Sequence, residues 1–219
     1  MSLELSGTTG VKGVAGSVSA PSIVGDDTNT GISFPAADTI KFSTGGVERM
    51  SITNSGITGV SAGITMADQW RVTSGFDSYN TIITSNWERQ DTYSPGLIGS
   101  GMSESSGIFT FPTTGIYRID FQSHAMRGSG AFIRYVGITI DVTTNNSNYN
   151  LVSNSYSSIS NDDQAFAAMY CTTLFDVTDV STHKVRFVVY AENTVSWEGD
   201  TSSNRTSVIF TVCPPKPTS

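Results

Sequence analysis

The amino-acid sequence predicts an all-β protein whose second part is a sandwich or barrel of strands joined by polar turns. Three observations lead to this fold class. The 219 residues include 21 Gly and long runs of Ser, Thr and Asn, and only 14% are charged, against about a quarter in an average soluble chain. Several segments alternate apolar and polar residues with a period of two, and turn-forming clusters separate them. Aromatic residues make up 10% of the chain and can supply a core.

The composition changes near residues 60–68 and predicts a domain boundary there. Short apolar bursts with almost no aromatic residues precede it, whereas all three Trp and all eight Tyr follow it. We therefore expect an N-terminal anchor or shaft segment over residues 1–64 and a knob domain over residues 65–219.

The N-terminal segment is predicted to form short hairpins. Ile40–Thr44 and residues 47–52 flank Gly45-Gly46, a dipeptide that can close a two-residue turn, and Asn54-Ser55-Gly56 is a second turn. The segment has few large side chains, and small pieces bury little of their surface. We expect neighbours to order it, either copies of itself in an oligomer or a larger assembly.

The second part contains four clear alternating strands. Their apolar sets are expected to share one face within each strand. The sets are Tyr117, Ile119 and Phe121; then Phe132, Val136, Ile138, Ile140 and Val142; then Val185, Phe187 and Val189; and last Val208, Phe210 and Val212. Residues 164–177 are ambiguous because their alanines permit a helix, but the β-branched second half favours a strand.

The opposite faces of two of these strands are not polar. Ile133, Tyr135, Val188 and Tyr190 place apolar bulk where solvent would lie on a monomeric sandwich. Contiguous exposed apolar residues mark contact sites. We expect these four residues to lie in a homotrimer interface.

The run from Ser106 to Phe121 resembles the central signature of the C1q/TNF-like jelly roll. The family pattern Gly-x-Phe-x-x-Pro-x-x-Gly-x-Tyr, which joins two neighbouring strands, is matched by Gly107, Phe109, Pro112, Gly115 and Tyr117. Residues 174–177 with 183–190 look like the family's paired late strands, and 205–212 look like its closing strand.

This resemblance covers about residues 66–213 and implies a jelly-roll β-sandwich that forms a tight homotrimer. Two features depart from the family. Residues 1–60 lack the Gly-X-Y period of a collagen stalk, and no dense carboxylate loop corresponds to the calcium site of some members.

The first segment has a resemblance of its own. Residues 25–34 (GDDTNTGISF), then 44–50 (TGGVERM), then 54–56 (NSG) look like a module common in tail and head fibres of marine phages, cyanophages included. Such modules precede C-terminal knobs in trimeric fibres. The resemblance implies a virion location, with residues 1–64 contacting other virion proteins.

Charge and motifs exclude several classes of function. A net charge of −7 with scattered basic residues argues against nucleic acid as a partner. No stretch approaches the roughly 20 apolar residues of a membrane span, and the N-terminus does not resemble a secretory signal. Cys171 and Cys213 could pair if neighbouring strands bring them together, but two unpaired buried thiols are favoured.

The sequence offers little for catalysis, a cofactor or a metal. The two histidines, His124 and His183, have no local partners that mark a triad. The carboxylate pairs Asp162-Asp163 and Glu198-Gly199-Asp200 could in principle cleave glycosides, but solvated loop charge is favoured. We expect no catalytic, cofactor-binding or metal-ligating residues and no enzymatic activity.

Binding is better supported. Tyr149, Tyr156 and Trp197 lie in or beside polar segments rich in Asn and Ser, a setting that suits carbohydrate or protein surfaces. These three residues are candidate receptor contacts, and a core or interface role is the open alternative.

The sequence thus predicts a trimeric fibre or appendage of a phage virion, exposed on the particle, whose knob attaches to a host-surface glycan or protein or to other virion components. A capsid decoration protein is the main alternative. A polysaccharide depolymerase and a cellular C1q-like binding protein are less favoured.

Overall fold

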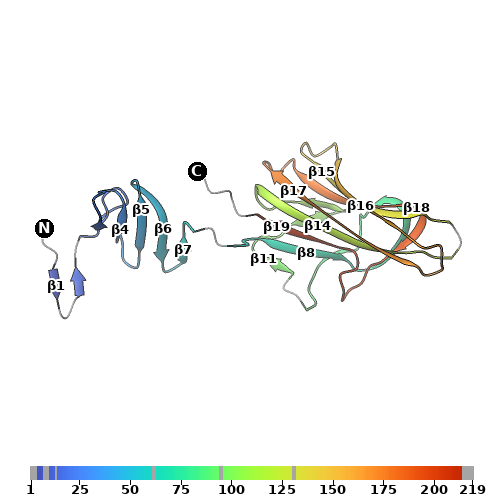
Figure 1. The fold of residues 1–219 in the computed structure, drawn as a ribbon, viewed down its shortest axis with the longest axis horizontal. Coiled ribbons are helices and arrows are strands. Elements are labelled where there is room, and N and C mark those ends of the chain that lie inside the picture. Colours follow the sequence, from blue (N-terminus) through green and yellow to red (C-terminus); the bar gives the residue numbers. More distant parts are fainter. Residues whose placement is uncertain are drawn as a thin grey trace. The chain divides into compact units, whose positions relative to one another are not determined.

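The computed structural model describes residues 4–6, 10–12, 14–60, 63–93, 96–129 and 132–213. The chain divides into two compact units, Met1–Ala62 and Gly63–Ser219, so the units meet two residues before the boundary at 64/65 expected from composition. Each unit is built from strands, as Figure 1 shows. The described residues contain no helix that is long and apolar enough to cross a membrane.

The first unit holds a small hairpin and a five-stranded antiparallel sheet. The hairpin pairs β1 (Glu4–Ser6) with β2 (Gly10–Lys12). The sheet runs in chain order through β3 (Ile23–Val24), β4 (Gly31–Ser33), β5 (Ile40–Thr44), β6 (Val47–Thr53) and β7 (Gly56–Thr58). Gly45 and Gly46 have φ angles of 59° and 74°, so the predicted Gly-Gly turn between β5 and β6 is confirmed.

The second unit is a jelly-roll sandwich of two facing layers. Its strands are β8 (Ala67–Val72), β9 (Phe76–Ile82), β10 (Trp87–Arg89), β11 (Leu97–Ile98), β12 (Ser103–Ser105), β13 (Ile108–Thr110), β14 (Gly115–Met126), β15 (Tyr135–Thr143), β16 (Asn150–Ser158), β17 (Phe166–Val177), β18 (Lys184–Trp197) and β19 (Ser207–Val212). The first layer has the order β10-β8-β19-β14-β17, with β11 also on β8, and the second places β13 and β9 beside β18, followed by β15 and β16. The layers join where β14 pairs with β18 at Ala125–Trp197 and Met126–Ser196.

The alternation predicted for β14 is confirmed. Tyr117, Ile119 and Phe121 are fully buried between the layers. Phe109 lies at the centre of the core, and its ring contacts those of Trp70, Trp87, Phe187 and Phe210 at centroid separations of 5.2–5.5 Å. Residues 164–177 form the predicted strand, β17, rather than a helix.

The phase predicted for residues 132–142 is wrong at its start. β15 begins only at Tyr135, and Val136, Ile138, Ile140 and Val142 are buried as expected. Phe132, however, is 65% exposed, whereas Ile133 is 1% exposed and belongs to the core. The residues before β15 do not continue its strand pairing. The Ile133 amide donates to the Asn161 side chain and not to a neighbouring strand.

Two expectations about pairing are also wrong. β13 and β14, on either side of the Pro112–Gly115 corner, do not pair, because β13 pairs with β18 in one layer and β14 with β17 and β19 in the other. The corner therefore carries the chain between layers, and the Tyr117 hydroxyl holds it by donating to the Thr113 carbonyl at 2.9 Å. The late strands β17 and β18 likewise lie in opposite layers.

Both cysteines are free thiols. Cys171 is buried on β17 and Cys213 is half-buried beyond β19, in agreement with the unpaired alternative. Burial raises the pKa of the Cys171 thiol to about 12.

Candidate functional site

Three tyrosines gather on the outward side of β16, β15 and β18. The rings of Tyr135 and Tyr190 stack with centroids 5.9 Å apart and an interplanar angle of 18°. The Tyr156 ring stands nearly perpendicular to both, at 6.1 Å from Tyr135 and 6.3 Å from Tyr190. We call this surface the tyrosine face.

A glycine makes the tyrosine arrangement possible. Gly137 on β15 pairs with Tyr156 of β16 on one side and with Tyr190 of β18 on the other. A Cβ at this position would lie 2.5 Å from a carbon of the Tyr156 ring. Because Gly137 has no side chain, the Tyr156 ring can occupy the space above it, and a larger residue at this position would displace the ring.

Polar and charged groups extend the tyrosine face along the strands. At one end Arg186 forms an ion pair with Asp141 at 3.2 Å, and the Tyr149 ring covers the guanidinium at 4.2 Å from its centroid. The Thr139 hydroxyl donates to Asp141 at 3.0 Å. These contacts place a cation–π pair and an aligned hydroxyl on the same side of the sheet as the tyrosines.

At the other end Arg134 and Glu192 are paired. The Arg134 Nε donates to Glu192 at 2.9 Å, and the Arg134 backbone amide donates to the same carboxylate at 3.0 Å. These bonds lower the pKa of Glu192, so it is ionised at neutral pH. A hydrogen bond with Tyr190 raises the pKa of Tyr135, so this tyrosine is uncharged at neutral pH. Each ion pair is balanced, and the tyrosine face carries no net charge from them.

The sequence-predicted residues divide between this surface and the core. Tyr135, Val188 and Tyr190, expected at a trimer interface, and Tyr149 and Tyr156, expected as receptor contacts, all belong to the tyrosine face. Tyr156 is 54% exposed and lies on strand β16 rather than in a loop.

Two predicted residues are not on the surface. Trp197 is 0% exposed, and its indole Nε1 donates to the Ser78 carbonyl at 3.0 Å, so it is a core residue and not a receptor contact. Ile133 is buried, as described above, and cannot contribute to an exposed interface. In both cases an apolar residue next to a polar loop turns inward at the end of the sandwich.

The outward side of the other layer carries an apolar surface that the sequence analysis missed. Phe166, Tyr170 and Leu174 project from β17, and Ile116 from the neighbouring β14. Leu174 is 66% exposed. We call this surface the β17 face. The sequence of residues 166–177 could have indicated this surface, because apolar residues occur on both sides of the alternating strand.

A polar group sits within the β17 face. Arg118 donates from Nε to Asp120 at 3.0 Å and from Nη2 to the Tyr170 hydroxyl at 3.2 Å, and the same hydroxyl donates to Asp120. The three side chains satisfy one another, so the group can be covered by an apolar partner at a lower desolvation cost than separate charges.

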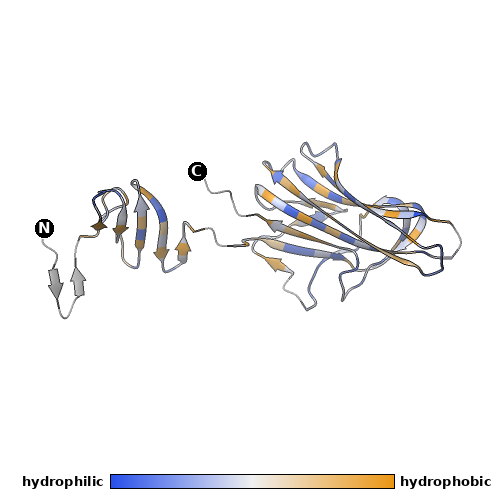
Figure 2. Cartoon of the chain, in the orientation of Figure 1, coloured by the Kyte–Doolittle hydropathy of each residue, from blue (hydrophilic) through white to orange (hydrophobic). Residues whose placement is uncertain are grey.

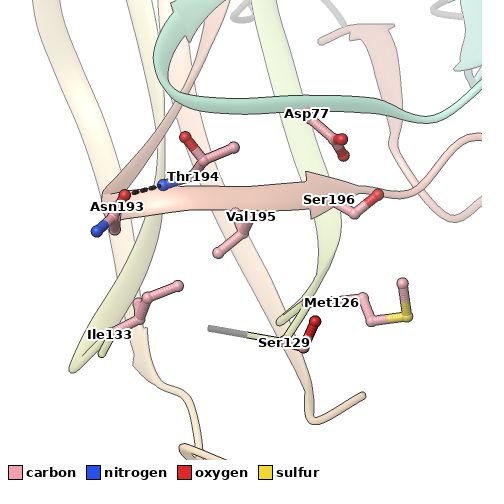
Figure 3. Close-up of a pocket in the computed structure, with 9 residues that line it drawn as sticks. Asp77, Met126, Ser129, Ile133, Asn193, Thr194, Val195 and Ser196 are labelled. Atoms are coloured by element: carbon pink, nitrogen blue, oxygen red, sulfur yellow. Dashed lines mark hydrogen bonds between the residues drawn. The ribbon is translucent and has the colours of Figure 1, made fainter. Parts of the chain in front are cut away.

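A cavity of about 440 Å³ opens at one end of the sandwich (Figure 3). Met126, Ile133 and Val195 give it an apolar wall, and the Thr194 amide donates to the Asn193 side chain at its edge. Among the nine described residues that line it, Asp77 has the one ionisable side chain, so these residues do not supply a pair of carboxylates.

The carboxylates weighed for glycoside cleavage have structural partners. Asp163 pairs with Arg127 at 3.2 Å, and Glu198 and Asp200 both pair with Arg205, at 3.0 and 3.7 Å. His183 is buried between the hydroxyls of Thr178 and Thr182. Within the part of the chain that the structure describes, no three His, Cys, Asp or Glu side chains gather in a metal-binding group.

Comparison with known proteins supports the fold. No protein-family model and no curated protein sequence matches the chain. The crystal structure of murine APRIL at pH 5.0 superposes with a TM-score of 0.50 and 13% identity, over 68% of this chain and 98% of APRIL. The structure of Eiger TNF from S. frugiperda superposes with a TM-score of 0.51 and 10% identity, over 72% of this chain and 99% of Eiger. Both are TNF-like jelly rolls, so the second unit has the TNF/C1q-like jelly-roll fold.

Proposed function

We propose that the chain is a structural subunit of a phage virion, a homotrimeric fibre or appendage exposed on the particle surface. Its jelly-roll unit attaches to a neutral glycan of the host surface, and residues 1–64 join it to other virion proteins. The protein acts by binding and not by catalysis. Three weak sites on one rigid trimer gain avidity without new contacts.

The observation that carries this proposal is the difference between the two outward sides of the sandwich. The β17 face presents bulky apolar side chains, whereas the tyrosine face presents aromatic rings among hydroxyls, amides and balanced ion pairs. A large apolar patch on a sheet is a surface for permanent subunit contact. Aromatic rings with nearby hydrogen-bonding groups suit a polar ligand that is bound and released.

The choice of a glycan follows from charge and hydrogen bonding. Nucleic acid and other polyanions need clustered basic groups, whereas Arg134 and Arg186 are both neutralised by carboxylates. Asn154 and Ser158 lie beside Thr139 and Tyr135 on the neighbouring strand. Their amide and hydroxyl groups match the donors and acceptors of sugar hydroxyls. The location on a phage particle is supported by the resemblance of residues 25–56 to marine-phage fibre modules.

The assembly is tested by light scattering of the full chain. Leu174→Asp on the β17 face should dissociate a trimer at micromolar concentration, because it buries an unpaired charge in the subunit contact. Leu151→Asp is the matched control, since Leu151 is similarly exposed on β16 of the other layer, where it pairs with Asp141 of β15. A monomeric parent chain, or a trimer unaffected by Leu174→Asp, contradicts the proposed assembly.

The attachment is tested on a panel of immobilised neutral and acidic oligosaccharides. Tyr156→Ala should weaken binding to neutral sugars by roughly tenfold, which corresponds to about 1.4 kcal/mol and is the upper range of one aromatic contact. Tyr79→Ala removes an equally exposed tyrosine from β9 and should leave binding unchanged. Binding to the capsid lattice without any glycan binding would favour a decoration protein, and release of oligosaccharides would favour a depolymerase.

A further inference from the structure

The five-stranded sheet of the first unit has one side made of apolar residues. Cross-strand partners point to the same side of a sheet. The register pairs Ile23 with Ile32, Ile32 with Phe42, and Phe42 with Met50, and the next row pairs Ile40 with Ile52 and Ile52 with Ile57. Every strand position in these two rows is therefore apolar. We call this side the isoleucine face, and Figure 2 shows the resulting alternation along β5 and β6.

The other side of the same sheet is different. It carries Ser33, Ser43 and Ser51, which are buried, and the ion pair between Lys41 and Glu48 at 2.7 Å. The Ser51 hydroxyl is hydrogen bonded to that of Thr58 across the strand pair. The Ser43 hydroxyl donates to the Gly31 carbonyl at 3.4 Å, whereas the buried Ser33 hydroxyl has no partner among the described residues.

The described residues of the first unit leave the isoleucine face uncovered. Ile57 is 61% exposed at one edge, and Ile23 and Ile52 are also exposed. Phe34, Ile40 and Ile52 line a hollow of about 400 Å³ whose rim includes Asp38 and Asn54. Domains normally bury the apolar side of a sheet against a second layer, and residues 14–60 supply none for this sheet.

We propose that the isoleucine face packs against the same face of other copies of this chain, so that three sheets enclose a shared apolar core. This inference rests on the homotrimer of the proposed function. The apolar rows require an apolar occupant, because a polar or charged partner would lose hydrogen bonds to water without replacing them. Residues 1–62 carry three basic and five acidic side chains, so copies repel one another only weakly.

The size of the face identifies the occupant as a tethered copy. The five strands hold 2, 3, 5, 7 and 3 residues, and at about 4.8 Å between strands and about 3.3 Å per residue the face covers roughly 300 Å² per copy. A stable interface between independent proteins needs about 800 Å² per partner. The isoleucine face therefore cannot capture a free partner tightly. Association of the jelly-roll unit supplies copies of the sheet at millimolar effective concentration, which compensates for the small area.

The test uses cysteine cross-linking in the full chain with Cys213→Ser. Ile57→Cys lies on the isoleucine face, and its neighbour Thr58→Cys lies on the opposite side of the same edge strand and is also exposed. At the other edge, Ile23→Cys is matched by Val24→Cys. Each variant has one accessible thiol per chain, so a short bismaleimide at low micromolar protein should link Ile57→Cys and Ile23→Cys into covalent dimers at roughly tenfold or greater yield over their controls.

Light scattering of each variant separates the possible failures. A trimeric chain in which all four cysteines cross-link equally, or none does, overturns the inference while the homotrimer stands. A monomeric chain overturns the homotrimer and the inference with it. Cross-links from Ile57→Cys that form only to other virion proteins, when particles are added, show a different occupant and also overturn the inference.

Discussion

Replacing Gly137 by alanine should separate binding from stability. The added Cβ would lie 2.5 and 2.6 Å from two carbons of the Tyr156 ring. Carbon atoms in ordinary contact are about 3.5–4.0 Å apart, so the ring must move by about 1 Å or more. Tyr156 is half exposed and can swing toward solvent, whereas the backbone of β15 is held between β16 and β18. We therefore expect the ring to give way, while the Ser155 carbonyl oxygen, 3.2 Å from the added Cβ, shifts by only a few tenths of an ångström.

Two opposing terms set the stability of Gly137→Ala. The displaced ring loses two edge-to-face contacts, each worth about 0.5–1.5 kcal/mol and nearer the lower value at an exposed site. Glycine within a strand is about 0.5–1 kcal/mol less favourable than alanine, because the unfolded chain is more flexible. The terms nearly cancel. The free energy of unfolding should change by less than about 1 kcal/mol, which shifts the melting temperature by at most about 2–4 °C.

Glycan affinity should nevertheless fall by roughly tenfold, because the perpendicular ring no longer lies beside the Tyr135–Tyr190 pair. The measurements are thermal unfolding, near-ultraviolet circular dichroism of the tyrosines, and binding to the neutral oligosaccharide found for the parent chain. Gly128→Ala is the control, since nothing lies within 4 Å of a Cβ there. Unchanged affinity with an altered tyrosine spectrum would refute the role of this arrangement. A loss of more than about 10 °C in melting temperature would refute the claim that the ring can move.

Three further predictions concern the jelly-roll unit. Trp197→Ala should destabilise it by about 3–5 kcal/mol in urea unfolding, because it empties a fully buried site and leaves the Ser78 carbonyl without its donor; a change under about 1 kcal/mol would contradict the core assignment. Asp200 accepts hydrogen bonds from the Ser202 amide and hydroxyl, and these bonds lower the pKa of its carboxyl group from 3.8. The ionised carboxylate therefore stabilises the folded state above pH 3.8, and this stabilisation is lost as the pH falls below that value. Asp200→Asn should therefore flatten the fall in melting temperature between about pH 4 and 2, and an unchanged slope would contradict this. In the Cys213→Ser chain, Cys171, buried with a raised pKa of about 12, should react with a thiol reagent at pH 8 only after unfolding, and rapid labelling of the native protein would show that β17 opens.

The fold was predictable because several signals coincide in the same short stretch. Pro112 and Gly115 mark a corner, and Phe109 and Tyr117 on either side alternate into the core. Local turn chemistry and period-two patterning agree there, and such agreement specifies a structure strongly. The strand pairs were less predictable, since the sequence shows that a chain turns a corner but not which layer it enters.

The two errors in the candidate site have different causes. Trp197 is the last residue of β18 and alternates inward with Val195, so the polar residues beside it in the sequence were a misleading guide to its exposure. Ile133 precedes β15, and the alternation that is reliable within a strand does not extend to it. The tyrosine cluster required three strands, β15, β16 and β18, whose register no local pattern encodes.

Strand β17 shows what an alternation with two apolar faces implies. Its inward side carries Ala167, Met169 and Cys171, and the half-buried Phe175 ring packs against that of Phe111 at 5.7 Å. Its outward side carries Phe166, Tyr170 and Leu174. Bulky residues thus stand on both sides of this strand, so bulk alone does not indicate which row faces the core. Large apolar side chains on the outward side would be exposed to water in a monomer and would not stabilise it. The outward row of β17 is therefore an argument for contact between subunits. The isoleucine face of the first unit extends the same argument, since the described residues of that unit supply no second layer to cover the apolar rows.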